Sequence, residues 1–167
     1  ELRAVPAGQL RDAAYAVQGQ GLSWCPHVDG WLLPDTTDAQ AESGAIHDIA
    51  TMIGSTGDDI GGAELLQGAG ARWCENQLKL GRRPAYLYFF DRKLPGDQAG
   101  AFHSSELWYE FETLSRGWRP WEEHDWELAE QLSAYWANFV KTGDPNGPGL
   151  PPWHPYAGEH KEALVLR

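Results

Sequence analysis

The chain alternates short apolar runs with longer amphipathic stretches, and this alternation constrains its fold more than any other feature. Residues 49–54 (IATMIG) form an apolar run bounded by polar turn residues, which predicts a buried strand. Residues 63–80 then predict a helix, and residues 85–90 (AYLYFF) predict a second strand after Pro84. A strand–helix–strand order of this kind favours an α/β fold with a mainly parallel sheet.

The predicted helices differ in how clearly the sequence marks them. Residues 125–142 are the clearest, because Asp125 can cap the start and Gly143 stands where a left-handed C-cap belongs. The apolar residues that recur there at three- and four-residue spacing are Leu128, Leu132, Tyr135, Trp136, Phe139 and Val140. Those expected on one side of the 63–80 helix are Leu65, Leu66, Ala69, Trp73, Leu78 and Leu80.

Weaker signals mark the rest of the chain. Residues 1–14 predict a short helix, and residues 34–36 (PDT) predict a turn and a helix start before the 38–44 stretch. A last apolar run lies at 163–166, beyond a stretch rich in proline and glycine. We find no internal repeat and no low-complexity tract.

Charge and composition exclude some partners and leave the compartment open. The chain has 24 acidic against 13 basic residues, and its net charge of −11 repels phosphate backbones, so we expect no nucleic-acid partner. No run of 18 apolar residues is present, so we expect no membrane span. Nine tryptophans suggest a core or pocket with many flat walls. Cys25 and Cys74 fit one disulfide or two thiols equally well, so a secreted, periplasmic or cytoplasmic location is open.

Two loops that follow the predicted strands carry residues suited to acid–base chemistry. Asp58 and Asp59 follow residues 49–54, and His103 follows residues 85–90. Catalytic side chains of α/β proteins lie on loops beyond the carboxyl ends of strands. An acid followed by a histidine is the order of the last two members of a Ser–Asp/Glu–His triad. On spacing alone, a surface or packing histidine is the better explanation.

Four sequence blocks occur together in one order. They are residues 28–30 (VDG), 54–59 (GSTGDD), 100–107 (GAFHSSEL) and 135–146 (YWANFVKTGDPN). This order resembles the type-B carboxylesterases, the family that includes cholinesterases and bacterial para-nitrobenzyl esterases. The third block is similar to the family's G-x-x-H-x-x-E around the catalytic histidine, and the second to its acid-bearing G-x-x-x-D-E loop. The blocks span nearly the whole chain, which makes the set far more specific than any one of them.

The resemblance implies an α/β-hydrolase fold. Residues 1–167 would then be the C-terminal segment of a single domain, contributing the last strands of a mainly parallel sheet flanked by helices. The implied activity is hydrolysis of a small-molecule carboxylic ester through an acyl-enzyme, with no cofactor or metal. His103 would be general base and acid, and Asp59 would orient it. Asp58 is the alternative acid, because Asp59 stands where the family usually has glutamate.

Three more residues are drawn into the expected site by the same resemblance. Glu106 matches the family's glutamate three residues after the histidine, where it would form hydrogen bonds behind the site or serve as a structural buried carboxylate. Phe102 and Trp108 would line the substrate pocket, because ester pockets are mostly apolar and aromatic. Aromatic core packing is the alternative for both.

The expected nucleophile is absent from these 167 residues. The family's serine lies in G-x-S-x-G on a strand-to-helix turn, and no such motif occurs in the chain. Because the chain starts at Glu1, we expect an N-terminal esterase portion with this serine, upstream or on a partner chain. Two rival hypotheses are a non-catalytic esterase-like binding or adhesion module and an independent small domain. The second would expose an unpaired sheet edge.

Overall fold

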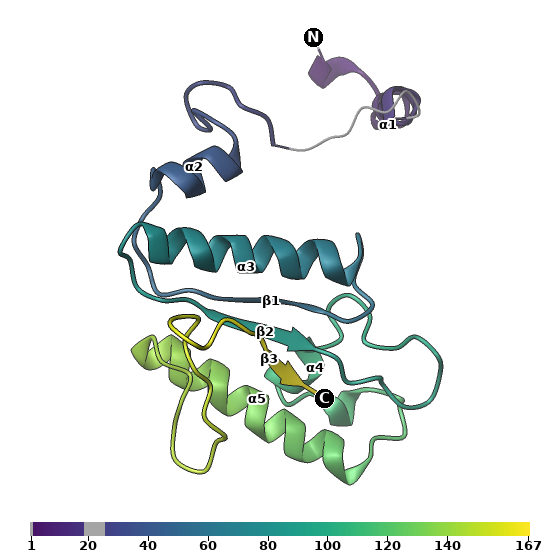
Figure 1. Cartoon of the computed structure of the whole chain (residues 1–167). Helices are drawn as coiled ribbons and strands as arrows, with labels where there is room; N and C mark the ends of the chain where they lie inside the picture. Colours follow the sequence, from purple (N-terminus) through teal and green to yellow (C-terminus); the bar gives the residue numbers. More distant parts are fainter. Residues whose placement is uncertain (1, 19–25) are drawn as a thin grey trace. The chain divides into compact units, whose positions relative to one another are not determined.

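The computed structural model describes residues 2–18 and 26–167, which divide into two compact units, Glu1–Ser43 and Gly44–Arg167. The regular elements described in the first unit are helices (Figure 1). Its elements are η1 (Leu2–Ala4), α1 (Ala7–Gln18) and α2 (Thr37–Ser43).

The helix predictions for the first unit hold with shifted bounds. The helix expected within residues 1–14 starts at Ala7 and continues four residues further than predicted, and the one expected at 38–44 starts one residue early. Thr36 marks that start, because its hydroxyl oxygen accepts the Ala39 backbone N–H at 3.2 Å. Cys25 lies outside the described residues, so its pairing with Cys74 is still an open prediction.

A tight turn closes the 28–30 block. One carboxylate oxygen of Asp29 accepts three backbone N–H groups, from Trp31, Leu32 and Leu33, at 2.8–2.9 Å. Hydrogen bonds from the backbones of Leu33 and Trp31 bring the pKa of Asp29 below its ordinary value. The aspartate of this block therefore has a local structural role.

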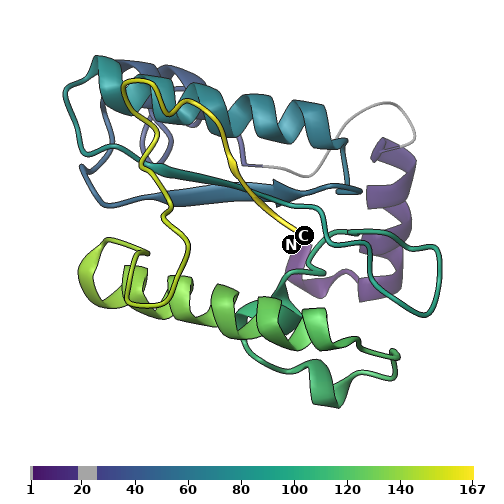
Figure 2. The same cartoon turned by 60° about the horizontal axis from the view of Figure 1, so that its bottom comes forward.

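The second unit is built on a three-stranded parallel sheet in the order β1-β2-β3. The strands are β1 (Met52–Thr56), β2 (Tyr86–Phe90) and β3 (Leu164–Leu166). The helix α3 (Ala63–Lys79) connects β1 to β2, and α5 (Glu123–Thr142) lies between β2 and β3 in sequence. Figures 1 and 2 show α3 along one face of the sheet and α5 along the other. The predicted parallel sheet flanked by helices is confirmed.

Alternate side chains of β2 enter two cores, one on each face of the sheet. Tyr86 and Phe90 pack with Leu132 of α5, whereas Leu87 packs with Cys74 of α3. This alternation follows from the two-residue period of a strand. Burial raises the pKa of the Cys74 thiol to about 12, so it is a packing residue at neutral pH.

The tryptophans divide between the core and the surface. Trp153 is buried and packs edge-to-face against Tyr86 and Tyr135, with ring centroids 5.7 and 5.3 Å apart. Its indole N–H donates to the carbonyl oxygen of Leu87 at 3.2 Å, which satisfies its polar atom. Trp118, in contrast, is exposed. The expectation of an aromatic core therefore holds for part of the tryptophan set.

The first strand is shifted from its predicted position. It starts at Met52 and ends at Thr56, and Ile49 is 63% exposed, so residues 49–54 are not one buried strand. Ser55 was expected in a loop because it is polar. Its hydroxyl oxygen accepts the Gln67 side-chain N–H at 2.8 Å, so α3 satisfies it inside the sheet.

The buried side of α3 also differs from the predicted one. Leu65 and Ala69 are exposed, and the buried residues are Gly70, Cys74 and Gln77. A Cβ at position 70 would lie 2.9 Å from the Leu87 side chain, so glycine lets the helix pack closely on β2. Small side chains thus face the sheet, a feature that an apolar pattern does not mark.

The C-terminal helix starts two residues before its predicted cap. Glu122 is the N-cap of α5, and Asp125 lies at the third helical position, where its carboxylate accepts the Glu122 backbone N–H at 2.8 Å. Gly143 ends the helix in the left-handed conformation with φ of 80°, as predicted. Val140 is 82% exposed and does not belong to the apolar face. The short helices α4 (Leu107–Glu110) and η2 (Leu114–Arg116) were not predicted.

A buried carboxylate joins the loop after β2 to the two helices that follow it. Asp125 is fully buried and accepts hydrogen bonds from the Arg92 guanidinium at 2.8 Å and the Tyr109 hydroxyl at 2.7 Å. Burial by itself raises the pKa of Asp125, but the hydrogen bonds from Arg92, Glu122 and Tyr109 bring it below its ordinary value. The carboxylate is therefore ionised and shared by three segments.

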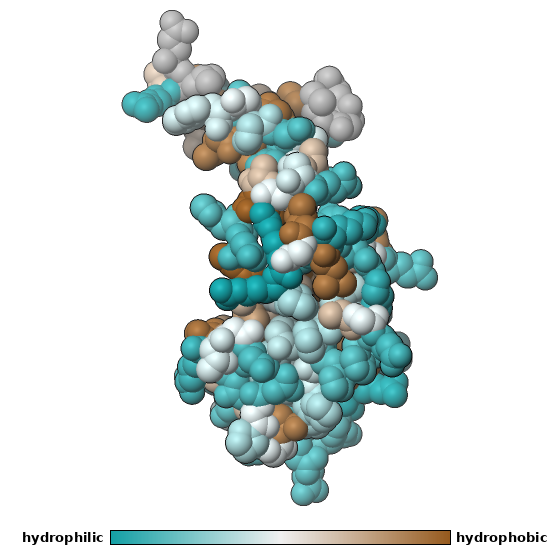
Figure 3. Space-filling view, turned by 60° about the vertical axis from the view of Figure 1, so that its left-hand side comes forward, coloured by the Kyte–Doolittle hydropathy of each residue, from teal (hydrophilic) through white to brown (hydrophobic). Residues whose placement is uncertain are grey.

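The surface of the second unit is mainly hydrophilic on the face that Figure 3 shows in its lower part, with hydrophobic residues in small groups. This agrees with the excess of acidic over basic residues. Among residues 2–18 and 26–167, no helix has an apolar stretch long enough to cross a membrane.

We predict that Asp125→Ala lowers the free energy of unfolding by about 3 kcal/mol. This is the lower end of the range for breaking a buried ion pair, because the Arg92 side chain is 18% exposed. Urea unfolding followed by tryptophan fluorescence measures the change. The matched control is Glu123→Ala in the same helical turn, which should cost less than about 1 kcal/mol. Equal losses for the two variants would contradict the proposed importance of the buried network.

Candidate active site

Two loops meet at the edge of the sheet where β1 and β2 end. Asp58 and Asp59 follow β1 directly, and the chain returns to them at Phe102 and His103 after the loop 91–101. A single parallel bridge pairs Asp58 with Phe102, and the Asp58 backbone N–H donates to the Ala101 carbonyl at 2.9 Å. The sheet pairing thus continues past the strands and sets the two loops side by side.

The imidazole of His103 contacts the carboxylate of Asp59. The Nδ1 atom of His103 lies 2.6 Å from Oδ1 of Asp59. The Asp59 side chain is 10% exposed and that of His103 is 58% exposed. An ionised carboxylate only accepts hydrogen bonds, so Nδ1 carries the proton of this pair and Nε2 is left for another partner.

The acid loop holds the Asp59 carboxylate in its ionised form. Its two oxygens accept the backbone N–H groups of Thr56 at 3.2 Å and Ile60 at 2.7 Å. Partial burial raises the pKa of Asp59, but the hydrogen bonds from His103, Thr56 and Ile60 outweigh it and bring the pKa below the ordinary value. Aspartate therefore reaches the imidazole from this loop although its side chain is shorter than that of glutamate.

The neighbouring carboxylate has different partners. Oδ2 of Asp58 accepts the Ala101 backbone N–H and the Lys93 ammonium, each at 2.8 Å. These hydrogen bonds, that of Lys93 first, bring the pKa of Asp58 below its ordinary value. Asp58 thus binds the backbone of the loop that carries His103, and Asp59 binds the imidazole itself.

Close backbone approach makes this contact possible. Gly100 has φ of 67°, and a Cβ at this position would lie 2.1 Å from Oδ2 of Asp58. Directly after His103, Ser104 also has a positive φ, 68°, which is uncommon for a residue with a side chain. The turn that presents the histidine is therefore both tightly packed and locally strained.

Two further carboxyl groups lie behind the pair. Glu106 is partly buried, and its Oε2 has no hydrogen-bond partner among the described residues. Burial raises the pKa of Glu106; the charge of Asp59 raises it too, and that of His103 lowers it. Glu110, one helical turn further on, has a pKa raised to about 7 by burial and by the charge of Glu106. The charges of both Asp59 and His103 therefore act on Glu106.

The aromatic residues expected at the substrate pocket pack beneath the histidine turn. Phe102 and Trp108 meet edge-to-face with ring centroids 5.8 Å apart, and Trp108 meets Trp121 in the same way at 5.8 Å. All three are partly buried against the larger core. The guanidinium of Arg119 lies over both Phe102 and Trp108. Their contact with a substrate stays a prediction.

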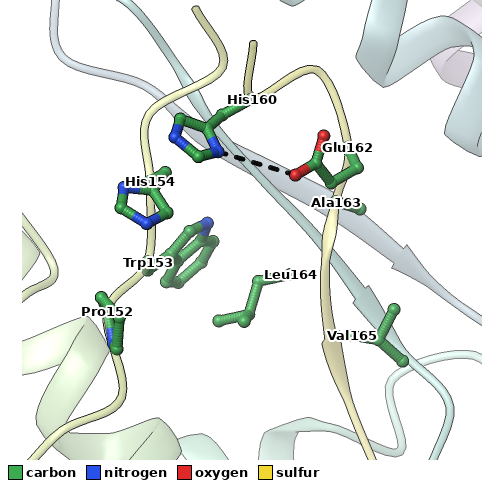
Figure 4. A pocket seen from close by; sticks show the side chains of 8 residues that line it. All are labelled: Pro152, Trp153, His154, His160, Glu162, Ala163, Leu164 and Val165. Atoms are coloured by element: carbon green, nitrogen blue, oxygen red, sulfur yellow. Dashed lines mark ion pairs between the residues drawn. The ribbon is translucent and has the colours of Figure 1, made fainter.

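A separate cavity of about 170 Å³ lies beside β3. Figure 4 shows its lining side chains, which are Pro152, Trp153, His154, His160, Glu162, Ala163, Leu164 and Val165. His154 and His160 stack with ring centroids 3.9 Å apart and an interplanar angle of 11°. Because nitrogen lone pairs lie in the ring plane, stacked rings do not converge on one ion. Within the described part of the chain, no three His, Cys, Asp or Glu residues form a metal-binding group.

Comparison with known proteins decides the family. A sequence model of the Carboxylesterase family matches residues 63–167, well over half of the chain. The chain belongs to the carboxylesterase family. Carboxylesterase 4A of Bos taurus is 38% identical to it over 84 residues, which are 47% of this chain and 15% of that protein.

Solved structures support the same fold for this carboxylesterase chain. A carboxylesterase from Geobacillus stearothermophilus matches 99% of the chain with a TM-score of 0.73 and 25% identity, and the match covers 46% of that protein. A PNB esterase matches 99% with a TM-score of 0.74 and 20% identity, covering 45% of that protein. The predicted α/β-hydrolase fold is confirmed, and the chain spans less than half the length of these relatives.

Sequence reasoning missed several contacts of the candidate site. Lys93 and Arg119 had no role in the prediction, because Asp58, which accepts from Lys93, and Asp97, which accepts from Arg119, lie more than 20 residues away in sequence. The available signal for Lys93 was the pair of adjacent basic residues at 92–93, directly after a strand. Glu110 offered a signal as well, since its four-residue spacing from Glu106 places both on one side of a helix.

Glu110 gives a stability prediction with a defined pH window. Its folded pKa of about 7 lies above the ordinary value of 4.5, so the folded state holds this proton more tightly than the unfolded chain. Folded stability therefore falls as the pH rises from about 4.5 to 7. Glu110→Gln should raise the unfolding temperature at pH 8 by roughly 2–4 °C and change it little at pH 4.5.

Thermal unfolding of wild type and variant across pH 4.5–8 measures this difference. Glu112→Gln is the control, because Glu112 is exposed two residues further along the chain. A stabilisation by Glu110→Gln that is the same at both pH values would contradict the assigned cause.

Proposed function

We propose that this chain supplies the catalytic histidine and acid of a serine carboxylesterase. His103 is the general base and acid, and Asp59 is the carboxylate that orients it. The 2.6 Å contact between Nδ1 of His103 and Oδ1 of Asp59 carries the proposal. It joins loops that follow adjacent parallel strands, where α/β enzymes place catalytic groups.

The nucleophile in this proposal is a serine of an N-terminal esterase portion, upstream in the polypeptide or on a partner chain. The chain spans 45% of the PNB esterase that it resembles, and no G-x-S-x-G motif occurs in its 167 residues. The substrate is a small carboxylic ester. The family membership of the chain supports this class of reaction.

The reaction follows from the protonation states of the pair. With the proton of Nδ1 bonded to Asp59, Nε2 accepts the hydroxyl proton of the serine as its oxygen attacks the ester carbonyl. His103 then gives this proton to the departing alcohol, which leaves an acyl-enzyme. In the second half, His103 takes a proton from water, the hydroxide attacks the acyl group, and the serine regains its proton as the acid departs.

Surrounding charges favour the imidazolium that forms in each half. Asp59 is its direct partner, and Glu106 adds a second carboxyl group whose charge acts on His103. Asp58 is a weaker candidate for the acid, because its carboxylate contacts Ala101 and Lys93. We place Phe102 and Trp108 against the apolar part of the ester.

We predict that His103→Ala lowers kcat for a short-chain p-nitrophenyl ester by about 10⁴-fold and Asp59→Asn by about 10²–10⁴-fold. Asp58→Asn should cost tenfold or less, because the amide oxygen still accepts the Ala101 N–H. The complete protein that includes the serine is assayed, and a fluorophosphonate followed by mass spectrometry locates the nucleophile.

The outcomes separate the proposal from its rivals. Full activity of His103→Ala would refute it. A larger loss for Asp58→Asn than for Asp59→Asn would move the acid to Asp58. A complete, folded protein that neither hydrolyses the ester nor reacts with the fluorophosphonate would be a binding module.

A further inference from the structure

We propose that Arg119 is a positioning residue for His103. It fastens the loop 91–101, which leads from β2 to the histidine turn, and it supports the ring of Phe102, the residue before His103. The inference rests on the proposed function, in which His103 transfers the protons. Arg119 acts through its neighbours and is not required to touch the substrate.

Arg119 is buried, unlike most arginines. It is 7% exposed, and its two terminal nitrogens donate to the two carboxylate oxygens of Asp97 at 2.8 and 2.9 Å. One of them also donates to the Pro95 carbonyl oxygen at 2.8 Å. This two-pronged pairing fixes the direction as well as the distance of the contact. Hydrogen bonding by Arg119 is the main reason that the pKa of Asp97 lies below its ordinary value.

The same guanidinium also lies over aromatic rings. Its central carbon lies 5.7 Å from the centroid of Phe102, 5.9 Å from that of Trp108 and 5.0 Å from that of Trp118. A cation over an aromatic face is attracted by the ring quadrupole, most strongly where water is excluded. One side chain thus joins Pro95, in the middle of the loop, to Phe102, the residue that follows the loop.

The loop backbone also packs directly on the segment that carries Arg119. Gly96 has φ of 99°, and a Cβ there would lie 2.8 Å from Cδ of Pro120. A side chain at position 96 would therefore clash with Pro120. The arginine and this close approach hold the same stretch of loop from two directions.

His103 depends on these contacts because it has few of its own. Its side chain is 58% exposed, and Asp59 is the hydrogen-bond partner found for its ring in the described residues. The residues before it position its backbone. Asp58 accepts the backbone N–H of Ala101, and Arg119 lies over the ring of Phe102. A misplacement of about 1 Å in a reacting group is enough to cost 10²-fold in rate.

The test compares Arg119→Lys, Arg119→Met and Asp97→Asn in the complete protein. Lysine keeps the charge but loses the planar two-pronged contact, and methionine keeps only the apolar stem. The control is Arg116→Met, an exposed arginine three residues earlier. For each variant we measure kcat and KM for a p-nitrophenyl ester, thermal unfolding, and the low-field proton resonance of the Nδ1–H between His103 and Asp59.

We expect Arg119→Met to lower kcat by about 10- to 100-fold with KM within about twofold, and to shift or broaden the low-field resonance. Arg119→Lys and Asp97→Asn should show smaller losses of the same kind, and Arg116→Met none. If Arg119→Met does not fold, the other two substitutions carry the test.

Two results would overturn the inference. One is lower stability with unchanged kcat and an unchanged resonance, which would make Arg119 purely structural. The other is a raised KM with unchanged kcat, which would place Arg119 in substrate binding. His103→Ala is measured in parallel: if it keeps full activity, the proposed function fails, and if it is inactive while Arg119→Met is normal, only this inference fails.

Discussion

The parallel pairing of β1 with β2 is the constraint on which the rest of the second unit depends. Because parallel strands run in one direction, both chains leave the sheet at the same edge. The pairing extends beyond the strands, first through the Gly57 N–H to the Phe90 carbonyl and then through the bridge between Asp58 and Phe102. The long loop between these two points leaves the sheet, and the bridge at Phe102 pairs the chain with the first loop again where it returns. The acid and the imidazole meet as a consequence of this second pairing.

The acidic groups near this edge show how differently one protein can accommodate negative charge. Asp125, in the interior, is compensated by a guanidinium, and Asp59 by backbone N–H groups and an imidazole. Among the described residues, Glu110 has no such donors to offset its burial, and it holds its proton up to about neutral pH. The cost of burying a carboxylate is thus met by pairing, by hydrogen bonding or by protonation. Only the first two leave a permanent negative charge on the carboxylate.

Periodicity in the sequence predicted the strands, the two long helices and the parallel sheet, because burial on a regular element repeats with its period. It misplaced the first strand, since the polar Ser55 is satisfied by a glutamine from a helix twelve residues away. It also assigned Leu65 to the buried side of α3, where a glycine and a cysteine face the sheet instead. For the candidate site, sequence blocks brought Asp58, Asp59 and His103 together and favoured Asp59 as the acid, but they left Asp58 as the alternative and did not divide the roles of the two. That division depends on which backbone each carboxylate reaches, and no local pattern records it.

The adjacency of these two acids limits how such a loop can change during evolution. Consecutive residues hold separate tasks, one toward the imidazole and one toward the backbone of the returning loop. Deleting a single residue between β1 and this pair would move Asp59 into the place of Asp58 and leave the imidazole without its carboxylate. Inserting one would move Asp58 into the place of Asp59 and leave the backbone of the returning loop without its acceptor. A point substitution disrupts the loop less, since glutamate in place of Asp59 keeps the order of the two acids. Homologous enzymes should therefore vary in the identity of the second acid while keeping its distance from the strand constant.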